Sequence, residues 1–323
     1  MGDAVLPLAD DTSAALFSNP AGLGRPKSTQ AQPMNLSFYG NSNYFGTLDS
    51  RVYKVTSLSS YAQTLIDHPG QPYGVGAAFL PSFGVEGFAA GLLVQSQLLA
   101  TGDLSGNIRN RSSYEIIPTA GFGFRTAGGI LRMGYSFQWV NRAAGDVLLP
   151  AGADLGYNQG LSQGSAMSHN AGMQITLPYA YLPSAAIVAR NIFGAHYSSW
   201  TLLNLSNASP GTPPDEPMSL DAALSLSPRI SGSSTMNWVF ELKDFTNISG
   251  VSLIGRVAVG LEVGLANAFY LRGGWGSGYP SFGFGIRRKQ SEIGFSYMSE
   301  EIGQRYHHER DVKYLVHFLV RAF

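Results

Sequence analysis

Apolar residues recur at every second position in many stretches of this chain. Between residues 255 and 265 one parity is wholly apolar, while the other carries glycine, alanine and charge (Val257, Val259, Leu261, Val263 and Leu265 against Arg256, Ala258, Gly260, Glu262 and Gly264). Residues 131–139 and 167–177 alternate in the same way. A period of two is typical of strands that have one apolar face, and a helix could not place either set on one side.

Fourteen such segments can be counted along the chain. They are 34–44, 72–80, 85–100, 113–125, 129–141, 166–177, 184–193, 218–227, 235–244, 254–264, 268–275, 281–288, 291–299 and 312–323. Short links, such as a turn expected at Pro81–Gly84, alternate with longer ones (45–71, 101–112, 142–165, 194–217, 245–253 and 300–311). An even number of strands with alternating short and long links predicts an all-β, transmembrane antiparallel barrel of about 14 strands, with both termini in the periplasm.

Composition agrees with this prediction and excludes other classes. Charged residues make up 13% of the chain, against about 25% in a soluble domain, yet the mean hydropathy is only +0.01. Zero net charge argues against a nucleic-acid partner, and the absence of cysteine excludes disulfides and thiolate metal sites. A soluble sandwich or a propeller is the alternative, but several segments reach the ten or so residues that a tilted membrane strand needs.

The first 33 residues do not alternate. Asp10 and Asp11 can cap a short helix over residues 12–17, and the turn Asn19-Pro20-Ala21-Gly22 would end it. Since this segment is too apolar to stay in water, we expect it to fill the barrel as a hatch, or plug. A loose N-terminal tail is the alternative.

A family resemblance follows from the same residues. Leu8-Ala9-Asp10-Asp11 followed by Asn19-Pro20-Ala21-Gly22-Leu23 resembles the N-terminal signature of the FadL-type transporters of hydrophobic compounds and of the related PorV/PorQ-type barrels of the type IX secretion apparatus. The resemblance implies a hatch at 1–33, a barrel of 14 strands at 34–323, and residence in the bacterial outer membrane. It also implies that Asp10, Asp11 and residues 19–22 act in gating.

The last segment carries a second resemblance. The terminal Phe323 is similar to the signal by which the barrel-assembly machinery recognises its clients, which makes that machinery an expected partner. Val312, Tyr314, Val316 and Phe318 form the apolar parity, however, and Phe323 belongs to the other one. Either a bulge shifts the register or Phe323 points inward.

Charged residues fall on the parity that we expect to face the lumen, because lipid-facing Arg or Lys at mid-depth costs about 2–4 kcal/mol. This set comprises Glu86, Glu115, Arg125, Arg132, Asp221, Glu241, Lys243, Arg256, Glu262 and Arg272. Ion pairs between neighbouring strands explain most of them. Alternatively, Arg132, Arg256 and Arg272 are candidates to bind an anionic head group, such as a fatty-acid carboxylate, through the guanidinium fork.

Pro118 lies inside the fourth segment, where it cannot donate a strand hydrogen bond. One expectation is a bulge near the outer rim. The other is a gap between the third and fourth strands, through which an apolar ligand leaves sideways into the bilayer, as the resemblance to FadL-type transporters implies.

The long loops suggest two further features. In 55–71, Leu58, Tyr61, Ala62, Leu65 and Ile66 have helical spacing, which predicts a short amphipathic helix that packs over the barrel end or captures ligand. The proline-rich loop 194–217 is stiff enough to dock a partner protein.

No catalytic constellation, cofactor motif or convincing metal site is visible, and His307-His308-Glu309 reads as a solvated loop. The leading hypothesis is therefore a passive outer-membrane transporter of hydrophobic small molecules that resemble long-chain fatty acids. The alternative is a PorV/PorQ-like barrel that docks a secreted or envelope protein. An open porin is disfavoured, because the hatch would block it.

Overall fold

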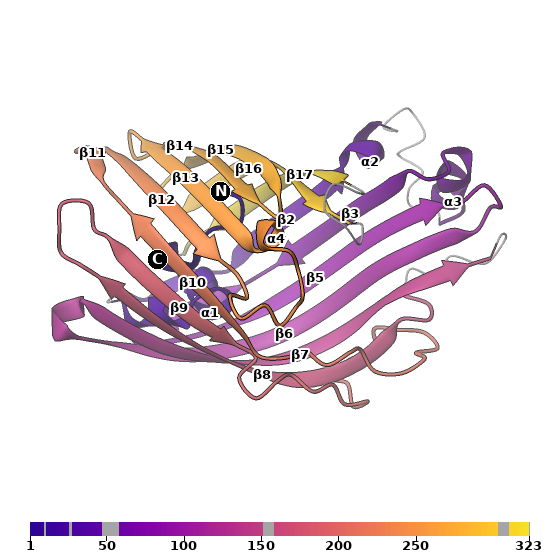
Figure 1. The fold of residues 1–323 in the computed structure, drawn as a ribbon, viewed down its shortest axis with the longest axis horizontal. Helices are drawn as coiled ribbons and strands as arrows, with labels where there is room; N and C mark the ends of the chain where they lie inside the picture. Colours follow the sequence, from indigo (N-terminus) through magenta and orange to yellow (C-terminus); the bar gives the residue numbers. More distant parts are fainter. Residues whose placement is uncertain (10, 26–27, 47–57, 151–157, 303–309, 323) are drawn as a thin grey trace.

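The strands form one closed antiparallel wall. The computed structural model describes residues 1–9, 11–25, 28–46, 58–150, 158–302 and 310–322. Within these ranges fourteen strands form the circle, each paired with its chain neighbour, and the last pairs with the first (Figure 1). They are β2 (Met34–Asn41), β3 (Pro72–Phe79), β5 (Phe88–Gly102), β6 (Ile108–Thr126), β7 (Leu131–Leu149), β8 (Ser162–Thr176), β9 (Ser184–Arg190), β10 (Ser219–Leu226), β12 (Ser234–Leu242), β13 (Val257–Leu265), β14 (Phe269–Gly276), β15 (Tyr279–Arg287), β16 (Ser291–Glu301) and β17 (Arg310–Val320).

Smaller elements complete the fold. Three short strands extend the wall: β1 (Gln30–Gln32), β4 (Ser82–Val85) and β11 (Arg229–Ser231). The α-helices are α1 (Thr12–Phe17), α2 (Ser42–Gly46), α3 (Leu58–Asp67) and α4 (Leu253–Arg256), and the 3-10 helices are η1 (Leu6–Leu8), η2 (Pro20–Gly24) and η4 (Ala127–Gly129). The strand count and the closed barrel that the alternation predicts are thus confirmed.

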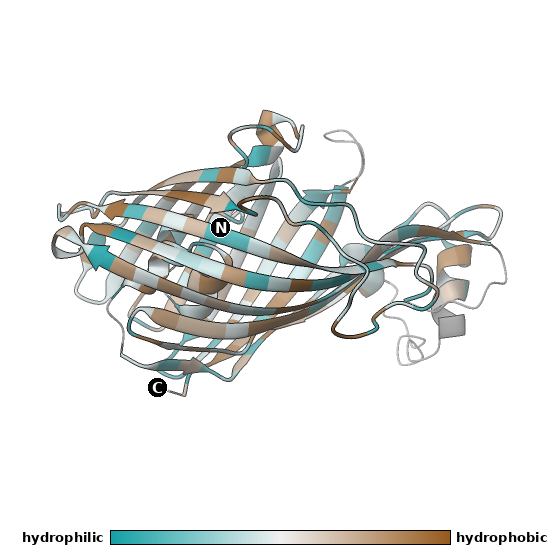
Figure 2. Cartoon of the chain, turned by 90° about the horizontal axis from the view of Figure 1, so that it is seen from below, coloured by the Kyte–Doolittle hydropathy of each residue, from teal (hydrophilic) through white to brown (hydrophobic). Residues whose placement is uncertain are grey.

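Alternation in sequence becomes two faces of the wall. Large apolar side chains such as Phe240, Leu271 and Phe318 are exposed on the outside, whereas Glu241, Glu262 and Glu292 are buried on the inside. Figure 2 shows the resulting change of hydropathy from residue to residue along the strands. This arrangement matches the apolar exterior and polar interior of a membrane barrel.

One predicted turn is instead part of the wall. Residues 82–85 form β4, which pairs with β5 in the same register as β3 does, and the chain reverses at Glu86 and Gly87. Pro81 interrupts the ladder locally, but Leu80 and Leu92 donate across the break to the carbonyls of Asn35 and Pro81. Glu86 is consequently exposed in a turn and does not face the lumen.

Strands β5 to β8 are much longer than the others and form an arm beyond one rim of the barrel (Figures 1 and 2). The predicted amphipathic helix is present there as α3, and its Leu65 is fully buried against Tyr73, Ala100, Ile108 and Leu149. Arg111 of β6 donates to the carbonyl of Ile302 at 3.1 Å, which ties the arm to the end of β16. We call this rim the long-loop end and the opposite rim the short-turn end.

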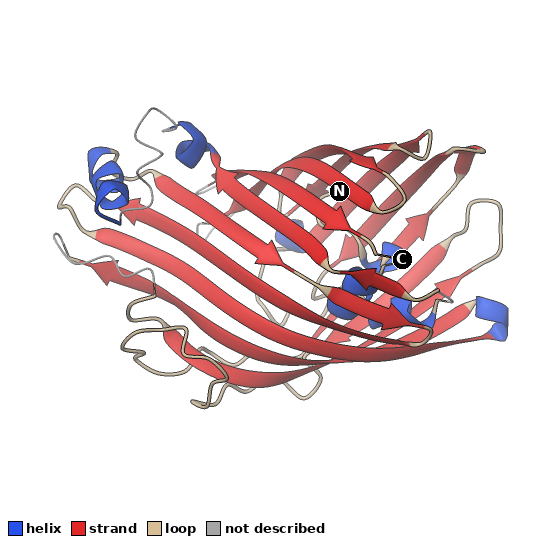
Figure 3. Cartoon of the chain, turned by 180° about the vertical axis from the view of Figure 1, so that it is seen from behind, coloured by secondary structure: helices blue, strands red, loops and turns tan. Residues whose placement is uncertain are grey.

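The N-terminal segment lies inside the barrel. Helices α1, η1 and η2 contact inward-facing residues of β5 to β10, and Figure 3 shows short helices enclosed by the wall. Ala4, Leu6, Ala15, Leu16 and Ala21 are all at most 1% exposed. Residues 1–9 and 11–25 are called the plug below. Strand β1, which falls within the predicted hatch, belongs to the wall sheet through its pairing with β4.

Candidate functional site

Asn19 organises the turn of the plug. Its side-chain carbonyl accepts from the amide of Ala21 at 3.0 Å, and its side-chain amide donates to the carbonyl of Leu6 at 2.9 Å. Asp11 caps α1 in the predicted way, by accepting from the amide of Ala14. Asn19 is completely buried, so both of its bonds are protected from water. Asp10 lies outside the described residues.

Glycines on the inner wall receive this turn. A Cβ atom on Gly134 of β7 would lie 1.9 Å from the carbonyl oxygen of Pro20, and one on Gly172 of β8 would lie 2.2 Å from the side-chain oxygen of Asn19. Both glycines therefore allow a close approach of the plug that no other residue would permit. Pro20, Ala21 and Gly22 are fully enclosed between the plug and the wall.

Arg190 tethers the C-terminal end of α1 to the wall. Its guanidinium bonds Asp221 of β10 at 2.5 Å and the carbonyls of Phe17 and Ser18 at 3.3 and 3.2 Å. Asp221 also accepts from the amide of Asp244, in the loop after β12. The plug is thereby linked to a loop at the long-loop end.

Asp244 in turn fixes the shape of that loop. Its burial would raise the pKa of the carboxyl, but hydrogen bonds from Ser249, Ile248 and Thr246 outweigh this effect and lower the pKa to about 2. Asp244 therefore stays ionised, and holds the loop, throughout the physiological pH range.

Two of the three arginines predicted to bind a head group line one cavity, to which residues of the plug also contribute. Arg132 and Arg272 line a polar cavity of about 660 Å³. Arg272 bonds Glu262 on the neighbouring strand at 2.6 Å. Arg256 is elsewhere: it belongs to α4 and donates to the carbonyls of Val251 and Asp244 in the loop. The pair of Arg272 and Glu262 is thus an ion pair between neighbouring strands, of the kind expected for most of the inward charges.

Pro118 does not open the wall between the third and fourth strands, because its pairing with Leu92 of β5 is intact. The ladder is interrupted on the other side, where Ile117 and Pro118 lack pairing with β7. The register is the same on both sides of this interruption, so there is no bulge either. One absent hydrogen bond, the one that proline cannot donate, accounts for it.

A larger break separates β8 from the chain that follows β9. Ile192 donates to the carbonyl of His169, and Ser165 and Ser198 exchange two backbone bonds. Between these links, the edge of β8 at Met167 makes no backbone hydrogen bond to residues 193–197, all of which the structure describes. We call this break the window.

Backbone strain accompanies the window. Asn191, Phe193 and Gly194 have φ angles of +49°, +73° and +77°. A phenylalanine rarely adopts the left-handed region, and Phe193 is 84% exposed, so its own packing cannot be what holds it there. Such strain is often stored at functional sites. Sequence reasoning missed the window, since residues 184–193 alternate like an ordinary strand.

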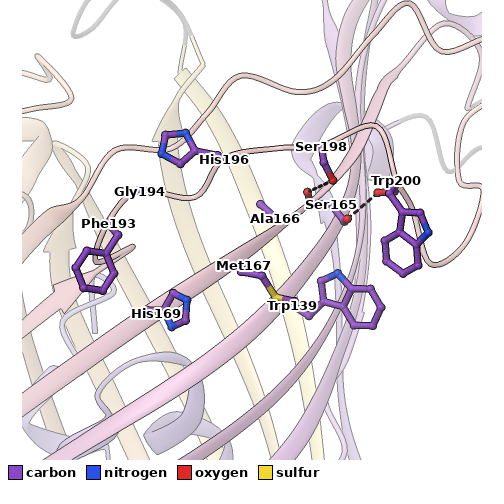
Figure 4. A pocket seen from close by; sticks show the side chains of 10 residues that line it. All are labelled: Trp139, Ser165, Ala166, Met167, His169, Phe193, Gly194, His196, Ser198 and Trp200. Atoms are coloured by element: carbon purple, nitrogen blue, oxygen red, sulfur yellow. Dashed lines mark hydrogen bonds between the residues drawn. The ribbon is translucent and has the colours of Figure 1, made fainter.

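A pocket of about 400 Å³ opens at the window, on the outer face (Figure 4). Trp139 of β7 and Trp200 stack at 5.0 Å between ring centroids along one side. The other lining residues are Ser165, Ala166, Met167, His169, Phe193, Gly194, His196 and Ser198. The volume and the apolar lining suit a small hydrophobic ligand. We call this the wall pocket.

An apolar group of side chains lies directly behind the wall pocket, on the lumen side. Ile117, Val140, Ala166, Ala195 and Tyr197 are buried there and pack with Phe17 of α1 and with Leu93. We call them the lumen cluster. Because Ala166 belongs to both, the lumen cluster and the wall pocket adjoin at a small side chain.

The loop after β9 is held against the wall. Asn141 of β7 bonds the backbone of Leu202 and Leu203, and Gln163 of β8 bonds Leu203, Leu205 and Ser206. Its proline-rich part is also pinned, since the carbonyl of Gly211 accepts from Gln163. These bonds are typical of a loop that is fixed to the wall rather than of a free docking element.

Other kinds of site are not evident. No three His, Asp or Glu side chains of the described residues are placed to hold a metal ion. Residues 307–309 and Phe323 lie outside the described ranges. Across the same ranges, no helix has the length and apolarity needed to span a membrane.

A closed barrel of fourteen strands, with apolar residues outside and a plug inside, defines a membrane β-barrel of the plugged class. The chain is similar to the Pseudomonas putida toluene transporter TodX (13% identity, 99% of this chain and 97% of that one covered, TM-score 0.51). It is also similar to the CymD monoaromatic hydrocarbon channel (10%, 99% and 98%, 0.53) and to a Pseudomonas aeruginosa FadL homologue (12%, 99% and 95%, 0.50).

No protein-family model and no curated protein sequence matches the chain. At identities this low, the structural likeness establishes the fold alone. The function has to be argued from the plug, the window and the lumen.

Proposed function

We propose that this chain is an outer-membrane channel through which hydrophobic small molecules move passively. The observation that carries the proposal is the window, because it joins the lumen cluster to the wall pocket through Ala166. Non-helical backbone without partners is tolerated at membrane depth only where it lines a cavity or is covered by protein. The similarity to hydrocarbon channels supports the same function.

The path proposed for the ligand begins at the long-loop end. A hollow of about 710 Å³ at the arm, lined by residues such as Leu104 and Leu148, would receive it from outside. The ligand would then pass to the lumen cluster, where Phe17 of the plug lies in its way, and leave through the window into the bilayer. The plug blocks a straight route, and Asn19 to Gly22 are among its buried residues.

The proposal includes an orientation of the barrel in the membrane. Outer-membrane barrels keep their short turns in the periplasm and their long loops outside. We accordingly place the short-turn end and both termini in the periplasm, and expect the C-terminal strand with Phe323 to be the part that the barrel-assembly machinery binds.

Enlarging Ala166 tests the path. In liposomes whose outer leaflet is lipopolysaccharide, uptake of radiolabelled toluene and of a long-chain fatty acid would be measured for wild type and Ala166→Phe. Filling the junction should lower the assisted rate roughly tenfold, because a close-packed site cannot absorb a benzyl group without strain. Ala171→Phe, on the outer face of the same strand and outside the wall pocket, is the matched control and should keep the wild-type rate. Equal uptake by both variants would mean that the ligand takes another route.

A docking subunit is the second candidate, and the arm is the feature that favours it. Leu104 and Leu148 are 93% and 65% exposed on the arm, a position suited to contact with another protein. If wild type fails to speed the uptake of any hydrophobic probe, this role becomes the better explanation of the fold.

A further inference from the structure

A polar network borders the lumen cluster. Arg142 of β7 pairs with Glu115 of β6 at 2.5 Å and also with Glu216, and its guanidinium lies 5.6 Å above the ring of Tyr197, a member of the cluster. Asn191 donates to the second carboxylate oxygen of Glu216 at 3.1 Å. Charged groups therefore lie directly beside the proposed path.

The charges in this network do not balance. Arg142 serves two carboxylates, Glu115 and Glu216, while Arg190, on the Phe17 side of the cluster, is matched one to one by Asp221. These two guanidiniums and three carboxylates leave one net negative charge. The most accessible of the three carboxylates is Glu216, whose side chain is 36% exposed.

We propose that the lumen cluster selects by charge: it accepts neutral or cationic hydrophobic molecules that carry a hydroxyl or amine, and it rejects carboxylates. This inference rests on the proposed function and narrows its ligand class. Of the ligands that the sequence suggests, it disfavours an ionised fatty acid.

The physical basis is the sign of the interaction with Glu216. A carboxylate that moves from water to this site loses hydration and meets an uncompensated like charge, and both effects oppose binding. A hydroxyl or ammonium group instead donates a hydrogen bond to an ionised acceptor, which is stronger than a bond between neutral groups. The apolar part of either molecule packs against the same side chains, so the head group decides.

A matched pair of probes tests this directly. Binding of 4-ethylbenzyl alcohol and of 4-ethylbenzoate to the full chain in nanodiscs would be measured by calorimetry at neutral pH, where the acid is ionised. We expect the alcohol to bind at least about tenfold more tightly, a difference of roughly 1.4 kcal/mol. In Glu216→Gln the ratio should fall toward one, whereas Glu86→Gln, an exposed acid in the turn after β4, should keep the wild-type ratio.

Salt provides a measurement that does not depend on the folding of a variant. Raising the ionic strength should reduce the preference of the wild type for the alcohol, because the repulsion is partly screened. Equal binding of both probes to the wild type would overturn the charge selection and leave the channel function standing. If neither probe binds, the proposed function fails and the selectivity fails with it.

Discussion

Single residues on the inner wall determine where the plug can rest. Gly134 and Gly172 have no functional groups, yet their lack of a side chain brings the wall within contact distance of Pro20 and Asn19. In the sequence, the inward glycines show only that one parity carries small and charged residues. Their clustering on adjacent strands was the available signal, but it has meaning only once the strand register is known.

Replacing Gly134 tests this directly. A valine there would clash with the Pro20 carbonyl, and overpacking of this kind costs about 1–3 kcal/mol, so the ratio of seated to unseated plug should fall roughly 5- to 150-fold. Single-channel recordings in planar bilayers should then show more frequent or larger openings. Gly273→Val is the control, since a Cβ at Gly273 meets nothing within 4 Å. An identical, quiet trace for both variants would contradict the role assigned to Gly134.

At the scale of elements, the two interruptions of the wall differ in kind. The one at Pro118 comes from a single missing donor in an unchanged register. The one between β8 and the chain after β9 involves three left-handed residues and an unpaired strand edge. Trp139, which lies opposite Pro118 in this register, lines the wall pocket, but the other lining residues all belong to β8 and to the chain after β9. We therefore assign ligand exit to the window and a purely local effect to Pro118.

Pro118→Val separates these two assignments. Valine restores the missing donor, so the variant should gain about 1 kcal/mol in unfolding free energy and keep the wild-type uptake rate. Urea unfolding followed by circular dichroism and the uptake assay described above would measure both. A clear fall in uptake would indicate that the ligand leaves at Pro118 and would count against the window.

Alternation along the chain was enough to predict the fourteen strands of the circle, though not the short β1, β4 and β11, because burial of one face imposes a period of two on the residues themselves. It was not enough at Pro81, where a proline and a glycine suggested a turn although the ladder continues past them. The window could not be predicted either, since nothing in the composition of residues 184–193 marks the left-handed φ angles at Asn191 and Phe193. Nor could spacing show that Arg256 would turn to loop carbonyls.

At the scale of the whole molecule, the barrel and the plug are held together by different interactions. The circle closes through β17 and β2 without help from the plug. The plug in turn is held by side chains of the wall, including Glu241, which accepts from the amides of Val5 and Leu6. This division suggests that the barrel can form without its plug.

Deleting residues 2–25 tests that independence. The shortened chain should keep the strand signal in circular dichroism, lose several kcal/mol of stability at roughly 1.5–3 kcal/mol for each large apolar side chain that loses its burial, and conduct ions freely. Folding in detergent micelles, thermal melting and bilayer conductance are the measurements. A chain that never folds would show that the plug belongs to the core of the barrel and that a separate hatch is the wrong description.

The stacked indoles at the window have a practical consequence. The chain has four tryptophans, and Trp139 and Trp200 lie nearly parallel, with 9° between their planes, at the edge of the wall pocket. Two chromophores this close couple their electronic transitions, so the pair should produce an exciton signal that a molecule inserted beside it would alter. Occupancy of the site could then be followed optically in the unlabelled protein.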